Sequence, residues 1–170
     1  MKMMFDIVRS SALILVLAFM PLALPACSDG RDAPEAEKVS LEMVGQAEIL
    51  QRINAAEGKV VLLNFWATWC EPCRAEIKHL KELREEYGED ELLILGVSVD
   101  RNVEAASSFA GRVGFNYPVF VATDSATQFF RVAAVPRLLI YDTRGALKIN
   151  AEGLVSTSKL REVIDQFLAG

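Results

Sequence analysis

The pair of cysteines at positions 70 and 73 constrains the fold of this chain more than any other feature. It follows an apolar run at 60–66, β-branched at its start, that is typical of a strand buried on both faces. After the pair, apolar residues recur at helical spacing as far as Tyr87. Cys70 therefore falls at a strand-to-helix junction, where unpaired backbone N–H groups and the positive end of the helix dipole favour a thiolate. Cys73 lies almost one turn further on and can reach back to close a disulfide.

Two simpler interpretations of the cysteine pair fit its surroundings less well. A zinc site needs a second pair of ligands, and the chain has one histidine, His79, and no further cysteine nearby. His79 falls among charged residues of the predicted helix, so we expect a solvated or partly packed side chain there. A purely structural disulfide would close a loop of four residues, for which the gain in chain entropy is smallest. Trp69 can cover one side of the thiols and Pro72 suits the first turn of a helix, which favours redox chemistry.

The segment from Phe65 to Arg74 resembles the active-site segment of the thioredoxin superfamily. The similarity is strongest to the TlpA/ResA/CcmG-like bacterial thiol–disulfide oxidoreductases, and it covers about residues 39–168. It includes Val135 and Pro136, which precede another apolar run. In the superfamily this proline is cis and packs against the cysteines, and the residue before it offers its backbone to an extended substrate. The resemblance therefore implies substrate binding by Trp69, Val135 and Pro136.

The resemblance also implies thiol–disulfide exchange, with Cys70 as the attacking thiolate and Cys73 as the resolving thiol. Thioredoxins proper place an acid on the strand before the motif, but this chain has Asn64 there, which cannot accept a proton. Glu76 follows Cys73 by three residues and matches an acid that ResA-like members place near the cysteines. We expect Glu76 to act as the base, provided that it is partly buried with a raised pKa. The alternative is a surface glutamate paired with a neighbouring lysine.

Two further charged residues lie close to these motifs. Arg137 follows the presumed cis-proline, where relatives often carry threonine. It either adds positive charge beside the thiols or points away into solvent. Glu71, between the two cysteines, is expected to be exposed and to tune the reduction potential.

The first 27 residues are typical of a bacterial secretory signal peptide. A basic start precedes an apolar run at 12–20, which is short for a membrane span. Leu24 to Cys27 resembles a lipoprotein box, so we expect lipidation of Cys27. Lipidation also accounts for the third cysteine, which would otherwise stay unpaired in an exported protein. The alternatives are an ordinary signal peptide whose cleavage removes Cys27, and an uncleaved anchor.

The remainder of the chain divides into a short tether and one domain. Residues 28–38 are polar, contain Gly and Pro, and lack apolar periodicity, as expected of a flexible tether. Residues 39–170 are enough for one compact domain. Removal of the signal peptide takes two of the 18 basic and one of the 23 acidic side chains, which leaves a net charge of about −6. No basic patch interleaved with aromatic residues is present, which disfavours nucleic-acid binding. We expect a monomer that uses neither a cofactor nor a metal.

Strands and helices alternate along the domain, which predicts an α/β fold with a central, mixed but mostly parallel sheet flanked by helices. We expect strands near 39–44, 60–66, 92–99, 117–121, 137–141 and 146–152, and helices near 47–56, 70–88, 103–113, 125–132 and 157–168. The last two strands form an antiparallel edge hairpin. The resemblance implies a thioredoxin-like fold in which about residues 103–122 add one helix and one strand to the minimal core. Ligands of such sheets gather at the carboxyl ends of strands, where Cys70 and the loop before Pro136 both fall.

By resemblance, the expected function is that of an exported, lipid-anchored thiol–disulfide oxidoreductase at the periplasmic or extracytoplasmic face of a membrane. It would reduce disulfides in exported proteins such as apocytochrome c during cytochrome c maturation, and a membrane-embedded thiol transporter would re-reduce it. One alternative is a copper or haem chaperone that uses the two thiolates as ligands, although a copper carrier would want wider cysteine spacing and a distal histidine. The other is a peroxide-reducing relative of the same fold, which would lack this Cys-X-X-Cys pair.

Overall fold

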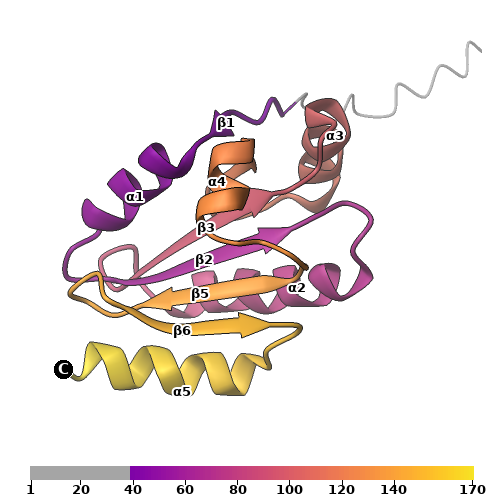
Figure 1. The fold of residues 1–170 in the computed structure, drawn as a ribbon. Coiled ribbons are helices and arrows are strands. Elements are labelled where there is room, and N and C mark those ends of the chain that lie inside the picture. Colours follow the sequence, from indigo (N-terminus) through magenta and orange to yellow (C-terminus); the bar gives the residue numbers. More distant parts are fainter. Residues whose placement is uncertain (1–38) are drawn as a thin grey trace, which may run out of the picture. The chain divides into compact units, whose positions relative to one another are not determined.

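The computed structural model describes residues 39–170, and the predictions for the signal peptide, for Cys27 and for the tether lie outside the described residues. Six strands form one sheet in the order β1-β4-β3-β2-β5-β6 (Figure 1). The strands are β1 (Met43–Val44), β2 (Val60–Trp66), β3 (Leu92–Ser98), β4 (Val119–Ala122), β5 (Arg137–Tyr141) and β6 (Leu147–Glu152). The helices are α1 (Gln46–Asn54), α2 (Glu71–Glu86), α3 (Val103–Val113), α4 (Asp124–Phe129) and α5 (Thr157–Leu168).

The pairing of the strands confirms the predicted mixed sheet. β1, β4, β3 and β2 run parallel to one another, whereas β5 pairs antiparallel with both β2 and β6. The expected additional helix and strand are α3 and β4, and β4 lies between β1 and β3. Within residues 39–170, no helix is both long enough and apolar enough to cross a bilayer.

The central strand β2 separates two layers of the core, because all of its residues are buried and successive side chains point to opposite faces. Val61, Leu63 and Phe65 pack with residues of α1 and α4 on one face. Val60 and Leu62 pack with residues of α2 and α5 on the other face. Full burial of each such side chain contributes about 2 kcal/mol to folding. The active-site helix α2 is therefore fixed against the middle of the sheet.

Several element boundaries differ from the prediction by one or more residues, and three of the differences have a clear local reason. The predicted strand at 39–44 shortens to β1, because Leu41 packs beneath α3 and its backbone N–H donates to the Ser107 side chain at 3.1 Å. β4 begins after Pro118, which has no N–H for the ladder. α4 ends at Phe129 because the chain turns at Arg131, whose φ of 52° is left-handed.

Candidate active site

Cys70 and Cys73 lie at the N-terminal tip of α2, as predicted. Cys70 is the N-cap residue, and its Sγ accepts a hydrogen bond from the backbone N–H of Cys73 at 3.2 Å. The two sulfurs are bonded, with their Cα atoms 5.3 Å apart, which confirms the predicted disulfide pair. Cys73 is fully buried, whereas Cys70 keeps 4 % of its surface exposed. A partner therefore meets Cys70 before it meets Cys73.

The loop that delivers Cys70 is held by Asp100, just past the carboxyl end of β3. The Asp100 carboxylate accepts hydrogen bonds from the Thr68 backbone N–H at 2.9 Å and from the Thr68 hydroxyl at 2.8 Å. A third donor is the Ser98 hydroxyl, at 2.7 Å. Asp100 was not predicted from the sequence. The signal that could have found it is a carboxylate directly after a buried parallel strand, where functional residues gather.

The loop before β5 lies against the cysteines. The Val135–Pro136 peptide bond is cis, as the resemblance implied. Val135 packs against the apolar cluster that contains both cysteines and Trp66. Trp69, the residue before Cys70, is 70 % exposed and so is presented to solvent. The residues expected to bind substrate thus combine an exposed ring with a loop next to the disulfide.

Glu76 is fully buried on α2, one turn beyond Cys73. Burial raises the pKa of its carboxyl to about 7, although the hydrogen bond from the Asn64 side chain and the nearby Val155 backbone lower it in part. The Asn64 amide nitrogen donates to Oε2 of Glu76. This burial excludes the alternative of a surface glutamate paired with lysine. The condition set for a basic role, namely a raised pKa in a buried position, is met.

Four buried polar atoms of β2, α2 and the segment before β4 have no hydrogen-bond partner among the described residues. They are Asn64 Oδ1, Trp66 Nε1, Glu76 Oε1 and Tyr117 OH. Burial, and then the nearby charge of Glu76, raise the pKa of Tyr117. Tyr117 was not predicted from the sequence, where its one signal is that a polar aromatic residue stands just before β4. Asn64 and Tyr117 thus lie close to Glu76 in a layer of the core that is otherwise apolar.

The structure also shows the surroundings of the other residues singled out in the sequence, His79, Glu71 and Arg137. His79 is half-buried with Nδ1 3.1 Å from the Val155 carbonyl oxygen, so it is partly packed as expected. Glu71 is exposed and lies 3.6 Å from Arg74. Arg137 is buried and contacts protein groups, so it does not point into solvent. Within residues 39–170, no group of three or more His, Cys, Asp or Glu side chains could hold a metal ion.

A redox dithiol at a helix tip, beside a cis-proline loop on a thioredoxin-like sheet, defines the class of thiol–disulfide oxidoreductases. Residues 30–152 match the model of the AhpC/TSA family, and the chain belongs to this family.

Known proteins of the same class support this assignment. The chain is 30% identical over 153 residues to the thiol:disulfide interchange protein HelX of Rhodobacter capsulatus. The aligned region covers 88% of this chain and 82% of HelX. It is 27% identical over 164 residues to the thiol-disulfide oxidoreductase ResA of Oceanobacillus iheyensis. The aligned region covers 91% of this chain and 84% of ResA. A solved thiol-disulfide isomerase from Corynebacterium glutamicum superposes with a TM-score of 0.64 at 19% identity, over 69% of this chain and 86% of that one. The predicted resemblance to ResA-like oxidoreductases and the thioredoxin-like fold are thereby confirmed.

Proposed function

We propose that this chain is an exported, membrane-tethered reductase of disulfides in other exported proteins. Apocytochrome c before haem attachment is the substrate that the resemblance to ResA-like proteins suggests. The observation that carries the proposal is the Cys70–Cys73 disulfide at the N-terminal tip of α2, where Cys70 keeps 4 % of its surface exposed and the carboxyl of Glu76 is buried one turn further on. Such a site can pass two electrons to a partner without a cofactor.

In the first step, the thiolate of Cys70 attacks one sulfur of the substrate disulfide. The substrate S–S bond breaks, a bond forms between Cys70 and that sulfur, and the other substrate sulfur leaves as a thiolate that takes up a proton. The N-terminal end of α2 stabilises the Cys70 thiolate, because the Cys73 N–H points at its sulfur and the helix dipole is positive there.

In the second step, Cys73 loses its proton and attacks the sulfur of Cys70. The mixed disulfide breaks, the reduced substrate leaves with both electrons, and the Cys70–Cys73 disulfide forms again. We assign the proton transfer to Glu76, because a carboxyl with a pKa of about 7 accepts a proton readily at neutral pH. Both thiols stand on one helix turn, so this step is intramolecular and fast. A membrane-embedded thiol transporter then supplies two electrons to restore the dithiol.

The substrate would bind over the exposed ring of Trp69 and along the loop of Val135 and Pro136. Val135 is packed against the cluster of the cysteines, so a polypeptide paired with its backbone would bring a disulfide to Cys70. The leader at 1–27 would direct export, and the lipidated Cys27 and the tether at 28–38 would keep the domain at the outer face of a membrane. The composition of these segments supports that location.

Reduction of insulin and of apocytochrome c by the wild type and by three variants tests this function. Cys70→Ser should abolish turnover, and Cys73→Ser should accumulate mixed disulfides through Cys70. Glu76→Gln should slow the resolving step about 100-fold, as expected for loss of a general base.

Three outcomes would contradict the proposal. The first is a Glu76→Gln variant that turns over at the wild-type rate. The second is a reduction potential above about −150 mV, which would favour oxidation of substrates. The third is tight binding of copper or haem by the reduced protein without disulfide turnover, which would favour a chaperone.

A further inference from the structure

The side chain of Arg137 connects segments on both sides of Pro136. Arg137 begins β5, directly after the cis peptide bond, and only 8 % of it is exposed. Its Nη1 donates to the carbonyl oxygen of Arg131 at 2.8 Å and to Oε1 of Glu152 at 3.0 Å. Its Nε is buried without a partner in the part of the chain that the structure describes. The two Nη1 contacts therefore offset part of the cost of burying this charge.

The first contact fixes the start of the proline loop. Arg131 has a φ of 52°, a left-handed conformation that is unfavourable for a residue other than glycine. Its carbonyl oxygen is turned toward Arg137, and the hydrogen bond to the guanidinium favours this conformation. The chain from Arg131 to Val135 then leads directly to Pro136.

The second contact fixes the end of the same loop. Glu152 is the last residue of β6 and stands opposite Arg137 in the β5–β6 ladder. The next residue, Gly153, donates its backbone N–H to the carbonyl oxygen of Pro136 at 2.9 Å. Arg137 and the end of β6 thus hold both sides of the loop.

Arg137 and the cysteines occupy opposite faces of the sheet. Arg137 stands opposite Phe65 on β2, and Phe65 belongs to the core layer beneath α1 and α4. Cys73 lies on α2, which covers the other face. Arg137 therefore does not belong to the cluster around the sulfurs, but the loop that it holds does reach them, because Val135 packs against that cluster.

We propose that Arg137 is a positioning residue for the binding of polypeptide substrates. By holding the Arg131 carbonyl and the Glu152 carboxylate, it fixes the backbone of residues 131–136, along which an extended, disulfide-bearing polypeptide pairs. The proposal rests on the proposed function. It implies that loss of Arg137 weakens the binding of a protein substrate and leaves the reactivity of the dithiol unchanged.

The test uses the full chain with the variant Arg137→Met, which keeps an unbranched side chain of similar length without charge. With insulin as the substrate, we expect a KM about tenfold higher and an unchanged kcat, as for the loss of a charge-assisted hydrogen bond. The rate at which dithiothreitol reduces the oxidised enzyme, and the reduction potential, should stay at their wild-type values, because a small dithiol does not need the loop. Backbone amides of residues 131–135 should exchange with deuterium faster.

The matched control is Arg161→Met, which removes another arginine–glutamate pair, with Glu86, away from Pro136. It should leave the KM for insulin unchanged. A folded Arg137→Met protein with the wild-type KM would overturn the proposal. Parallel losses in kcat and in the reaction with dithiothreitol would also overturn it, because they would mean damage to the dithiol itself.

Two further measurements keep the test decisive. If Arg137→Met does not fold, Glu152→Ala removes one of the two acceptors. This variant should still raise the KM for insulin with an unchanged dithiothreitol rate, and an unchanged KM would refute the role. If the wild type reduces neither insulin nor apocytochrome c, the proposed function is wrong. Amide exchange at 131–135 then decides by itself whether Arg137 holds the loop.

Discussion

Glu76 links the chemistry of the site to the stability of the fold. Its pKa is raised from 4.5 to about 7, chiefly by burial. Between these two pH values the native protein keeps a proton that the unfolded chain has released. The free energy of unfolding therefore falls as the pH rises through this window, and it changes little from this cause outside it.

We expect this effect to disappear in Glu76→Gln, because glutamine does not titrate. A pKa difference of this size corresponds to about 3 kcal/mol. Urea unfolding of the oxidised protein between pH 4 and pH 8 would measure it. The difference in the free energy of unfolding, Glu76→Gln minus wild type, should increase by up to about 3 kcal/mol as the pH rises. Parallel pH profiles for the two proteins would show that Glu76 ionises as easily in the native state as in the unfolded chain.

Residues that lie a few positions apart in a motif, such as the two cysteines, could be predicted from the sequence. The polar side chains that contact them from other elements could not. Cys70 and Cys73 stand on one helix turn, so local periodicity was enough to pair them. Asn64 was interpreted as the absence of an acid, but in the structure it donates a hydrogen bond to the acid supplied by α2. Tyr117 lies far from the motif in sequence and reaches the site only through the order of the strands. No local sequence pattern predicts that β2, α2 and the segment before β4 come together in this way.

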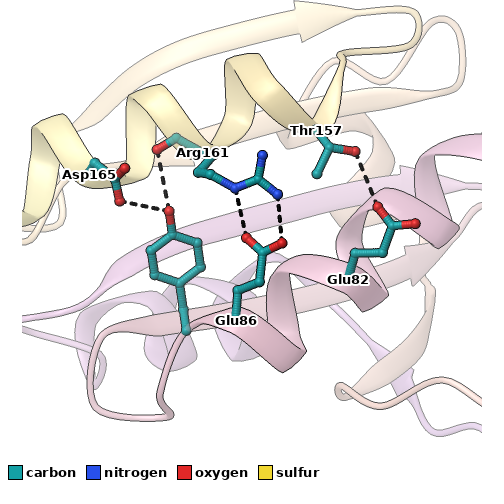
Figure 2. Close-up of polar contacts among 6 residues, drawn as sticks. Glu82, Glu86, Thr157, Arg161 and Asp165 are labelled. Carbon is teal, nitrogen blue, oxygen red and sulfur yellow. Dashed lines mark hydrogen bonds and ion pairs between the residues drawn. The ribbon is translucent and has the colours of Figure 1, made fainter.

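At the scale of elements, α2 and α5 are joined by polar contacts along the side where they meet (Figure 2). Arg161 donates to both carboxylate oxygens of Glu86, at 2.8 and 2.6 Å. The Tyr87 hydroxyl donates to Asp165 at 2.7 Å, at the C-terminal end of α2. Periodicity alone predicted both helices but counted Tyr87 as part of the apolar face. The packing of α5 beside α2 gives its hydroxyl a partner.

We expect Tyr87→Phe to lower the free energy of unfolding by about 1 kcal/mol. The substitution keeps the ring and removes the hydroxyl that donates to the Asp165 carboxylate, a contact of the kind that contributes this much. Chemical denaturation would measure the change. The rate of disulfide exchange should not change, because Cys70 stands at the opposite end of α2. A variant as stable as the wild type would mean that solvent replaces the contact at no cost.

The hydrophobic patterns predicted the type and order of all the elements, but the contacts between elements decided the boundaries. The neighbours of Leu41 in the sequence predict a strand. In the structure, Leu41 instead packs against small residues of α3 and is not part of the sheet. Arg131 reads as the continuation of a helix, yet its carbonyl binds Arg137, six residues on. In both cases a partner outside the local window determined the backbone.

At the scale of the whole molecule, the tether and anchor proposed for the segment ahead of Val39 would govern where the dithiol meets its substrates. A tether of the length proposed for residues 28–38 would span a root-mean-square distance of about 18 Å as a flexible chain. Anchored by lipid at Cys27, the active site would stay within reach of exported chains and of a thiol transporter in the same membrane. The anchor would then raise the effective concentration of both partners.

Replacement of Cys27 tests this arrangement directly. The wild type should incorporate labelled palmitate and partition into the detergent phase, because acyl chains contribute about 0.8 kcal/mol for each buried CH₂. Cys27→Ser should lose the label entirely, whereas Cys73→Ser, the matched control, should keep it. Insulin reduction by detergent-solubilised Cys27→Ser should match the wild type, because the dithiol lies in the domain that begins at Val39. Label retained in Cys27→Ser, or absent from the wild type, would mean that the chain is secreted or held at the membrane without a lipid on Cys27.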